Sequence, residues 1–257
     1  MVMLFDKEIQ QLVKEFHVIA RKKWIKSVDK GLGSIGYTFE NELGKQPDSL
    51  YFPDYYGTEI KCTGRYSRYP ITLFTAAFDG PTFPEINRIM DKYGYFDKKH
   101  LDKKVIFANL DCKCECYIAS GYYLKLDIDN KEEKIYLCVY DINRQFVERE
   151  SFVYFTTLYD HLMLKFERLA LVYASKKELD NEMFFRYYKI IVGKLRGFDV
   201  FLELIRVGII KVDLIVRVSK SGIDEGRYRN KNLVFKIKKI ILINCLKFYM
   251  CMITILI

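Results

Sequence analysis

The sequence contains few of the residues on which several classes of enzyme depend. It has three histidines in 257 residues. His17, His100 and His161 stand apart from one another and from any pattern of metal ligands, so each is interpreted as a core or surface side chain. Internal repeats and low-complexity linkers are also absent from the sequence. These absences disfavour histidine-based catalysis and a repeat architecture.

A secretory signal peptide is also lacking at the N-terminus, and the seven cysteines are odd in number and scattered. Both features favour reduced thiols and a cytoplasmic location. Three of the cysteines alternate with charged residues in the run 111–116, DCKCEC. Zinc sites usually use CxxC turns, whereas residues two apart lie on one side of a strand. The run therefore predicts a half-buried strand in preference to a metal site.

The composition is that of a folded, basic protein. Half of the residues are apolar and 16% are aromatic, which excludes a disordered chain. Lysine and arginine exceed aspartate and glutamate by 42 to 33, for a net charge of +9. Such an excess suits a polyanionic partner, either nucleic acid or an anionic membrane. Charge alone does not show whether the basic surface binds nucleic acid, a membrane or neither.

The apolar periodicity predicts a mixed α/β chain (α+β). Helices are expected over 4–27, 37–44, 85–93, 157–172 and 178–207, the last broken at Gly193 and Gly197. Strands are expected over 56–64, 69–78, 104–111, 116–129, 134–142, 211–219 and 233–238. The composition shifts near 150–175, which divides the chain into lobes 1–155 and 156–239 and a tail 240–257.

The tail 240–257 is apolar apart from one lysine and one asparagine, and three lysines precede it. Its 18 residues are slightly fewer than the about 20 that a membrane span needs, and Lys247 in its interior argues against a span. These features disfavour a membrane anchor. A buried strand and helix, or an extension beyond the domain, are the alternatives. Truncation after Lys239 is expected to leave a soluble, active protein.

The stretch PDYYGTEIK, residues 53–61, combines two carboxylates and a lysine. On a strand, Glu59 and Lys61 point to the same side, and a turn can swing Asp54 back toward Glu59. These carboxylates and the backbone carbonyl of Ile60 are oxygen ligands of the kind that Mg²⁺ prefers. Lys61 beside such an ion would hold or deprotonate an attacking water.

A second Pro-Asp pair, at Asp48, competes with Asp54 for the role of metal ligand. Asp48 is eleven residues from Glu59, so reaching the same metal would need a folded excursion of the chain. Spacing therefore favours Asp54. An edge strand with an exposed Glu-Lys pair is the alternative, because the spacing D-x₄-E-x-K alone is common by chance.

The wider context resembles a nuclease. PD-x₄-E-x-K is the pattern of the PD-(D/E)xK nucleases, and SIGYTFENELG (34–44) before it is similar to the MvaI/BcnI restriction endonuclease family and the related MutH nicking enzyme. In that family a Gly-rich turn and a short helix with a glutamate precede the strand, and Glu40 stands at the glutamate position. The resemblance is clear over about 31–80. It continues more weakly over 104–110 and 226–237, where Lys231-Asn232 replace the His-Gly that is frequent in the family.

The resemblance implies a restriction-endonuclease-like fold, with a mixed central sheet flanked by helices. It also implies a Mg²⁺-dependent type II enzyme that cleaves duplex DNA at a short specific sequence. It implies a catalytic lobe, 1–155, and a DNA-recognition lobe, 156–239, in a monomer without a stable protein partner. Asp54 and Glu59 would bind the metal, Lys61 would position the water, and Glu40 would orient Lys61 or assist a second metal.

For DNA contacts, Arg65 and Arg68 follow the catalytic strand and are expected to touch the phosphate backbone. Side chains able to read base edges gather in the loop 220–232: Arg227, Arg229, Asn230, Lys231 and Asn232. The alternative for each of these residues is a solvated side chain in a loop, without a DNA contact. The alternatives to a restriction enzyme are a MutH-like mismatch-repair nicking endonuclease and, from other classes, a non-catalytic DNA-binding protein or a membrane-anchored protein.

Overall fold

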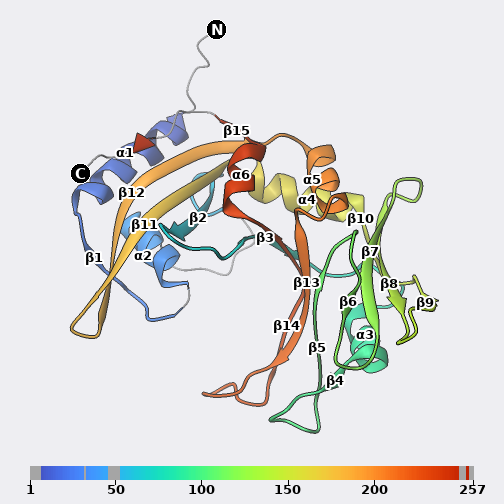
Figure 1. Ribbon diagram of the computed structural model, residues 1–257. Coiled ribbons are helices and arrows are strands. Elements are labelled where there is room, and N and C mark those ends of the chain that lie inside the picture. The colour runs from blue at the N-terminus through green and yellow to red at the C-terminus, as the bar shows by residue number, and fades with distance from the viewer. Residues whose placement is uncertain (1–6, 32, 46–52, 249–252, 255–257) are drawn as a thin grey trace. The chain divides into compact units, whose positions relative to one another are not determined.

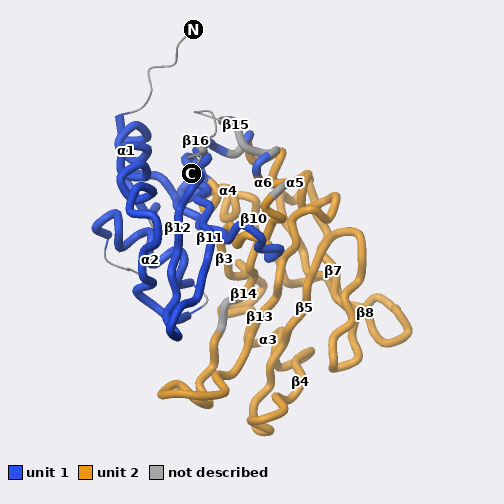
Figure 2. The backbone as a smooth tube through the Cα atoms, turned by 60° about the vertical axis from the view of Figure 1, so that its left-hand side comes forward, with its two compact units in different colours: residues 1–69, 163–196, 243–257 blue, residues 70–162, 197–242 orange. Residues whose placement is uncertain are grey.

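The computed structural model describes residues 7–31, 33–45, 53–248 and 253–254, with the backbone alone at 195, 230, 231, 240, 244–248 and 253–254. The chain forms two compact units (Figure 2). Unit 1 comprises Met1–Tyr69, Met163–Arg196 and Ile243–Ile257, and unit 2 comprises Pro70–Leu162 and Gly197–Leu242. Both units are discontinuous in sequence, unlike the expected lobes, whose boundary at 155 lies inside unit 2. Which unit cuts DNA and which reads it stays a prediction.

Unit 1 is built on a mixed sheet (Figure 1). Its helices and strands are α1 (Lys7–Arg21), β1 (Ile25–Lys26), α2 (Ser34–Glu42), β2 (Glu59–Gly64), β11 (Leu169–Leu179), β12 (Glu182–Leu195), β15 (Leu246–Phe248) and β16 (Ile253–Thr254). The strand order is β1-β12-β11-β2, and β15 and β16 also pair with β12. Only the β11–β2 pair is parallel, with Leu169 opposite Glu59, among the pairs that the described strands of this sheet form.

One face of the unit 1 sheet is covered by helices. The apolar residues of α1 recur at helical spacing and are buried, from Ile9 through Phe16 to Ala20. They pack with Phe39 of α2 against strand residues that include Ile60. Since side chains alternate along a strand, Glu59 and Lys61 lie on the opposite face. The helices thus anchor β2 and leave its charged side chains outside this core.

Unit 2 contains two antiparallel sheets. The remaining elements of the chain are β3 (Ile71–Ala76), α3 (Glu85–Tyr93), β4 (Tyr95–Phe96), β5 (Lys104–Leu110), β6 (Cys116–Tyr117), β7 (Tyr123–Asp129), β8 (Lys134–Tyr140), β9 (Phe146–Glu148), β10 (Phe152–Tyr154), α4 (Phe155–Phe166), α5 (Phe198–Arg206), β13 (Lys211–Val218), β14 (Tyr228–Ile237) and α6 (Lys239–Cys245). One sheet has the order β3-β14-β13-β5-β4, and the other β10-β8-β7-β6 with β9 on β8. Phe201 of α5 packs on Phe74 and Phe235 of the first sheet.

The expected mixed α+β fold is confirmed, but several segments differ from the expectation. A helix over 178–207 is wrong: its first part is β12, and only α5 is helical. Residues 184–192, FFRYYKIIV, are aromatic or β-branched for the most part, and β11 pairs with β12 along its whole length. Pairing with a strand close in sequence therefore outweighs the helical spacing of the apolar residues. Likewise β14 begins at Tyr228, so residues 228–232 extend the ladder with β13 and are not a loop.

The cysteine run also differs from the expected strand. Residues 111–115 form a turn, and the strand β6 begins only at Cys116. The Asp111 carboxylate closes the turn by accepting hydrogen bonds from the backbone N–H groups of Lys113 (2.7 Å) and Cys114 (2.6 Å). Within the described residues, no group of three or more His, Cys, Asp or Glu side chains is placed to hold a metal ion. The predicted half-buried strand over 111–116 is therefore wrong.

The tail belongs to the fold. Leu242 of α6 is fully buried, and β15 and β16 pair with β12 at Gly193–Leu195 and Lys189–Ile190. Of the three roles that the sequence left open, the structure shows the strand and helix. No helix in the described part of the chain is long and apolar enough to cross a membrane.

Candidate active site

The stretch 53–61 folds into a tight turn followed by β2. The backbone groups of Tyr55 and Thr58 exchange hydrogen bonds of 3.0 and 2.8 Å. The two residues between them both have positive φ, 42° at Tyr56 and 75° at Gly57. This is the geometry of a type I′ turn, which reverses the chain within two residues and favours glycine. The turn brings Asp54 back beside the start of β2, as the sequence predicts.

Asp54 is fixed by the strand that it precedes. Its Oδ2 accepts a hydrogen bond of 2.8 Å from the backbone N–H of Ile60, and its Oδ1 accepts one of 3.2 Å from Lys45 Nζ. The carboxylate is part-buried, with 21% of the side chain exposed. The hydrogen bond from the backbone N–H of Ile60 gives the Asp54 carboxylate one orientation, at the start of the strand that carries Glu59. Asp48, the competing aspartate, lies outside the described residues.

Glu59 is a buried carboxylate between two lysines. Only 2% of its side chain is exposed. Lys61 Nζ donates a hydrogen bond to Oε1, and Lys165 Nζ of α4 lies 3.7 Å from Oε2. Oε2 is buried and has no hydrogen-bond partner among the described residues. An ionised carboxylate in such a place normally has all its lone pairs satisfied, so this oxygen is suited to accept a further ligand.

Glu40 of α2 completes an electrostatic cluster. Burial, followed by the negative charge of Asp54, raises the pKa of the Glu40 carboxyl group above its ordinary value. Lys45 and Lys61 lower this pKa, and Glu59 raises it. The structure therefore brings the predicted residues Glu40, Asp54, Glu59 and Lys61 into one charged cluster on unit 1.

The donor set fits a hard divalent cation. Mg²⁺ usually binds through one or two protein carboxylates and retains several waters, so three close protein ligands are not required. Asp54 and Glu59 supply the carboxylates, and Glu59 Oε2 is the buried oxygen that lacks a hydrogen-bond donor among the described residues. The backbone carbonyl of Ile60 stays a predicted ligand. Lys45, Lys61 and Lys165 offset the negative charge of the carboxylates.

The predicted DNA-contacting residues fall in two places. Arg65 and Arg68 follow β2 in unit 1, and both are exposed. In unit 2, Arg229 on β14 lies directly opposite Arg217 on β13, and both line an open cavity of about 920 Å³. Lys220 lines the same cavity. Like charges at opposed positions of a sheet repel each other, so the Arg217–Arg229 pair suits an anionic or hydrogen-bond-accepting partner.

The structure describes the side chains of only two of the other residues predicted to read base edges, Arg227 and Asn232. Arg227 pairs with Asp224 at 3.0 Å across the turn. The side chains of Asn230 and Lys231 lie outside the described residues, and Asn232 has a left-handed backbone with φ of 52°. Val216 pairs with Asn230 and the preceding residue with Asn232, so Lys231 forms a bulge between them.

Three basic residues near these sites were not predicted. Lys45 contacts Asp54, Lys165 contacts Glu59, and Arg217 opposes Arg229. Arg217 alternates with the buried residues of a predicted strand, and this pattern marks it as outward-facing. No sequence signal marks Lys165, which the tertiary fold brings beside Glu59 from more than a hundred positions along the chain.

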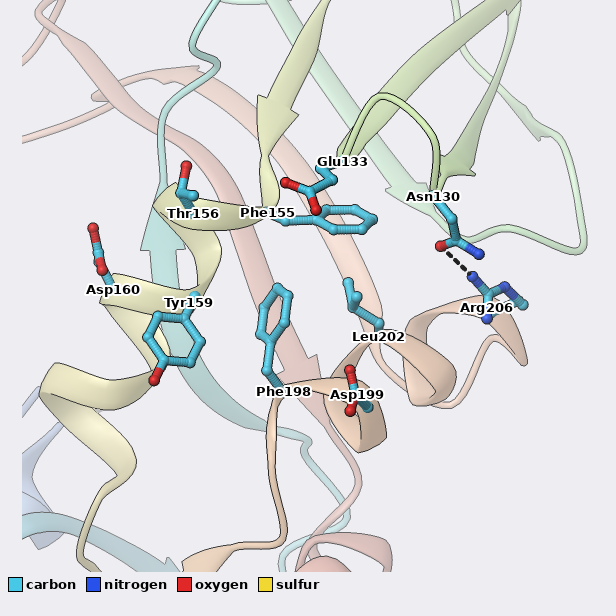
Figure 3. Close-up of a pocket in the computed structure, with 10 residues that line it drawn as sticks. All are labelled: Asn130, Glu133, Phe155, Thr156, Tyr159, Asp160, Phe198, Asp199, Leu202 and Arg206. Carbon is cyan, nitrogen blue, oxygen red and sulfur yellow. Dashed lines mark hydrogen bonds between the residues drawn. The ribbon is translucent and has the colours of Figure 1, made fainter.

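A further cavity of about 540 Å³ lies in unit 2 (Figure 3). Aromatic rings of α4 and α5, Phe155, Tyr159 and Phe198, line it together with the acidic residues Glu133, Asp160 and Asp199. Arg206 donates a hydrogen bond of 3.0 Å to Asn130 at one side. The acidic lining is unsuited to phosphate, and none of the predicted site residues lies there.

Comparisons with known proteins agree with this geometry. The solved complex of restriction endonuclease MvaI with its cognate DNA is similar over 98% of this chain and 100% of that chain, with a TM-score of 0.87 and 22% identity. MvaI in the absence of DNA is similar over 95% and 97%, with a TM-score of 0.60 and 19% identity. These likenesses establish the fold. No curated protein sequence matches the chain.

A match to a family model shows that the chain shares a family, in addition to a fold, with known proteins. The model of the MvaI/BcnI restriction endonuclease family matches residues 13–244. This range includes the helix with Glu40, the turn with Asp54, the strand with Glu59 and Lys61, and the strands with Arg217 and Arg229. The chain therefore belongs to the MvaI/BcnI restriction endonuclease family and is a type II site-specific endonuclease that acts on the phosphodiester bonds of DNA.

Proposed function

We propose that the chain cleaves duplex DNA in a Mg²⁺-dependent reaction at the cluster of Asp54, Glu59 and Lys61. The observation that carries this proposal is the buried Glu59 Oε2, which lacks a hydrogen-bond donor among the described residues beside a second carboxylate. Magnesium bound there would polarise the phosphate and stabilise the leaving oxygen. Asp54 and Glu59 would hold the ion, together with the Ile60 carbonyl.

Lys61 and Glu40 have separate roles in the proposal. The Lys61 side chain donates a hydrogen bond to Glu59 Oε1. In the reaction Lys61 positions the attacking water as an ammonium ion, or deprotonates it as a neutral amine. Glu40 orients Lys61 or assists a second metal ion. Lys165 balances the charge of Glu59 on its other oxygen. Each of these groups is carried by a helix or strand, which holds it in a fixed geometry before DNA binds.

The DNA-binding surfaces of the proposal are basic. Arg65 and Arg68 contact the backbone beside the cut, and Arg229 with Arg217 contacts base edges, for which an arginine fork is suited to guanine. Neither Arg217 nor Arg229 has a carboxylate partner among the described residues. We also propose that the enzyme acts as a monomer in the cytoplasm.

The test is digestion of plasmid and phage DNA by the purified protein. With Mg²⁺ we expect discrete fragments, whose ends identify the recognised sequence, and with EDTA we expect intact DNA. Fragments that form equally well in EDTA would contradict the metal requirement. A smear without discrete fragments would contradict sequence-specific cleavage.

A further inference from the structure

A bulge interrupts the hairpin of β11 and β12 on unit 1. Tyr173 of β11 pairs with Lys189, and the next residue, Ala174, pairs with Tyr187. Tyr188 therefore has no opposite residue. A bulge adds one residue to a strand and redirects its side chain, and bulges are frequent next to active sites. The question is what the redirected Tyr188 contacts.

Tyr188 contacts the arginine that follows the strand of the candidate active site. The guanidinium carbon of Arg65 lies 5.9 Å from the centre of the Tyr188 ring and 5.4 Å from that of Tyr66. The Arg65 backbone N–H donates a hydrogen bond of 2.8 Å to Ala174 at the bulge. Two rings and a backbone contact thus fix Arg65, and its planar fork keeps N–H donors for another partner.

Arg65 lies on the same side of the sheet as Lys61. Its guanidinium group lies over Tyr188, whose ring centre is 6.3 Å from that of Tyr173, and Tyr173 pairs with Thr63, two residues after Lys61 on β2. Arg65 follows Lys61 by four residues, a distance of about 13 Å along an extended chain. Tyr173 lies on this face as well, with the Lys189 ammonium group 5.2 Å from its ring centre. A basic, aromatic strip therefore leads away from the carboxylates.

No carboxylate partner of Arg65 is present among the described residues, and its neighbour Tyr66 has 84% of its surface exposed. A guanidinium group that is fixed, accessible and without an internal counter-ion is suited to a phosphate, which accepts two of its N–H donors. Along one DNA strand the rise is about 3.4 Å per nucleotide, so Arg65 would reach a phosphate a few nucleotides from the bond at Lys61.

We infer that Tyr188 is a positioning residue, which holds Arg65 against a backbone phosphate of duplex DNA outside the bond that is cut. The inference rests on the proposed function for its partner, duplex DNA. It adds that the bulge in β12 places this ring against Arg65.

The test is the affinity for a labelled duplex that contains the cleavage sequence, measured in EDTA by fluorescence anisotropy at several salt concentrations. Arg65→Ala is expected to weaken binding about tenfold and to reduce the slope of log K against log salt by about 0.9, the value for one phosphate contact. Tyr188→Ala is expected to weaken binding about threefold, and Tyr188→Phe, which keeps the ring, less than twofold.

A double variant separates positioning from an independent contact. If Tyr188 acts through Arg65, Arg65→Ala/Tyr188→Ala will bind no more weakly than Arg65→Ala alone. In cleavage assays the single variants are expected to raise KM more than they lower kcat. Arg21→Ala, which removes an exposed charge from the helix on the other face of the sheet, is the matched control and should leave Kd unchanged.

Several outcomes overturn the inference. Arg65→Ala that binds like the wild type contradicts the phosphate contact, and additive losses in the double variant contradict positioning. An equal loss in Tyr188→Phe and Tyr188→Ala assigns the effect to the hydroxyl group. If Tyr188→Ala unfolds, Tyr66→Ala tests the same stack from its exposed side, with a loss of about twofold expected. Wild type that binds no duplex contradicts the proposed function itself.

Discussion

Replacing Glu59 by glutamine is expected to lower the single-turnover rate of DNA cleavage by about a thousandfold or more. The amide keeps the shape of the side chain but removes the negative charge between Lys61 and Lys165. It also replaces one carboxylate oxygen by an NH₂ group, which does not bind a cation. The rate is measured on a labelled duplex with saturating enzyme and Mg²⁺, so that product release does not contribute.

The matched control is Glu42→Gln. Glu42 lies on α2, the helix of Glu40, and pairs with Lys22 at 2.6 Å. The same change of charge is made there without touching the cluster, and the rate is expected to change less than about threefold because an exposed ion pair contributes little. A Glu59→Gln variant that is folded and cuts as fast as this control would contradict the metal site.

Removing the tail is expected to have the largest effect on stability. A chain that ends at Lys238 lacks α6, which buries Leu242, and lacks β15 and β16, two of the four described strands that pair with β12. β12 then loses partners on the side away from β11. We expect the truncated chain to be insoluble or to melt at least about 10 °C lower, since stabilities of 5–15 kcal/mol leave little margin. This reverses the expectation from sequence that the tail is dispensable.

A point variant tests the same element without deleting it. Leu242→Ala is expected to lower the free energy of unfolding by about 2–5 kcal/mol because the side chain is fully buried. Ile223→Ala, at a residue that is 97% exposed, should change it by less than about 0.5 kcal/mol. Chemical denaturation followed by circular dichroism measures both. A Lys238-terminated chain that matches the full chain in melting temperature would show that the tail is not part of the core.

Local spacing in the sequence predicts much of the candidate site. The positions of Glu59 and Lys61 follow from the alternation of a strand, and the Gly57 turn places Asp54. The helix 85–93 was predicted with its observed bounds. Each of these features depends on residues that lie a few positions apart in the sequence. Periodicity and turn chemistry determine such short-range structure.

The rest depends on contacts between distant segments. Lys165 reaches Glu59 from the C-terminal part of α4, just before β11, which lies parallel to β2. The aromatic and β-branched run 184–192 resembles a helix by its apolar spacing, and only pairing with β11 and the tail makes it a strand. Tyr188 is the clearest case, because the bulge that redirects it is a property of the paired hairpin.

The most direct test of the central claim compares two aspartates in one digestion. Wild type, Asp54→Ala and Asp48→Ala are incubated with phage DNA and Mg²⁺, after circular dichroism has shown that all three are folded. Because Asp54 is hydrogen-bonded to the start of β2 beside Glu59, the account predicts discrete fragments from wild type and Asp48→Ala and uncut DNA from Asp54→Ala. Equal cleavage by Asp54→Ala and wild type would contradict it.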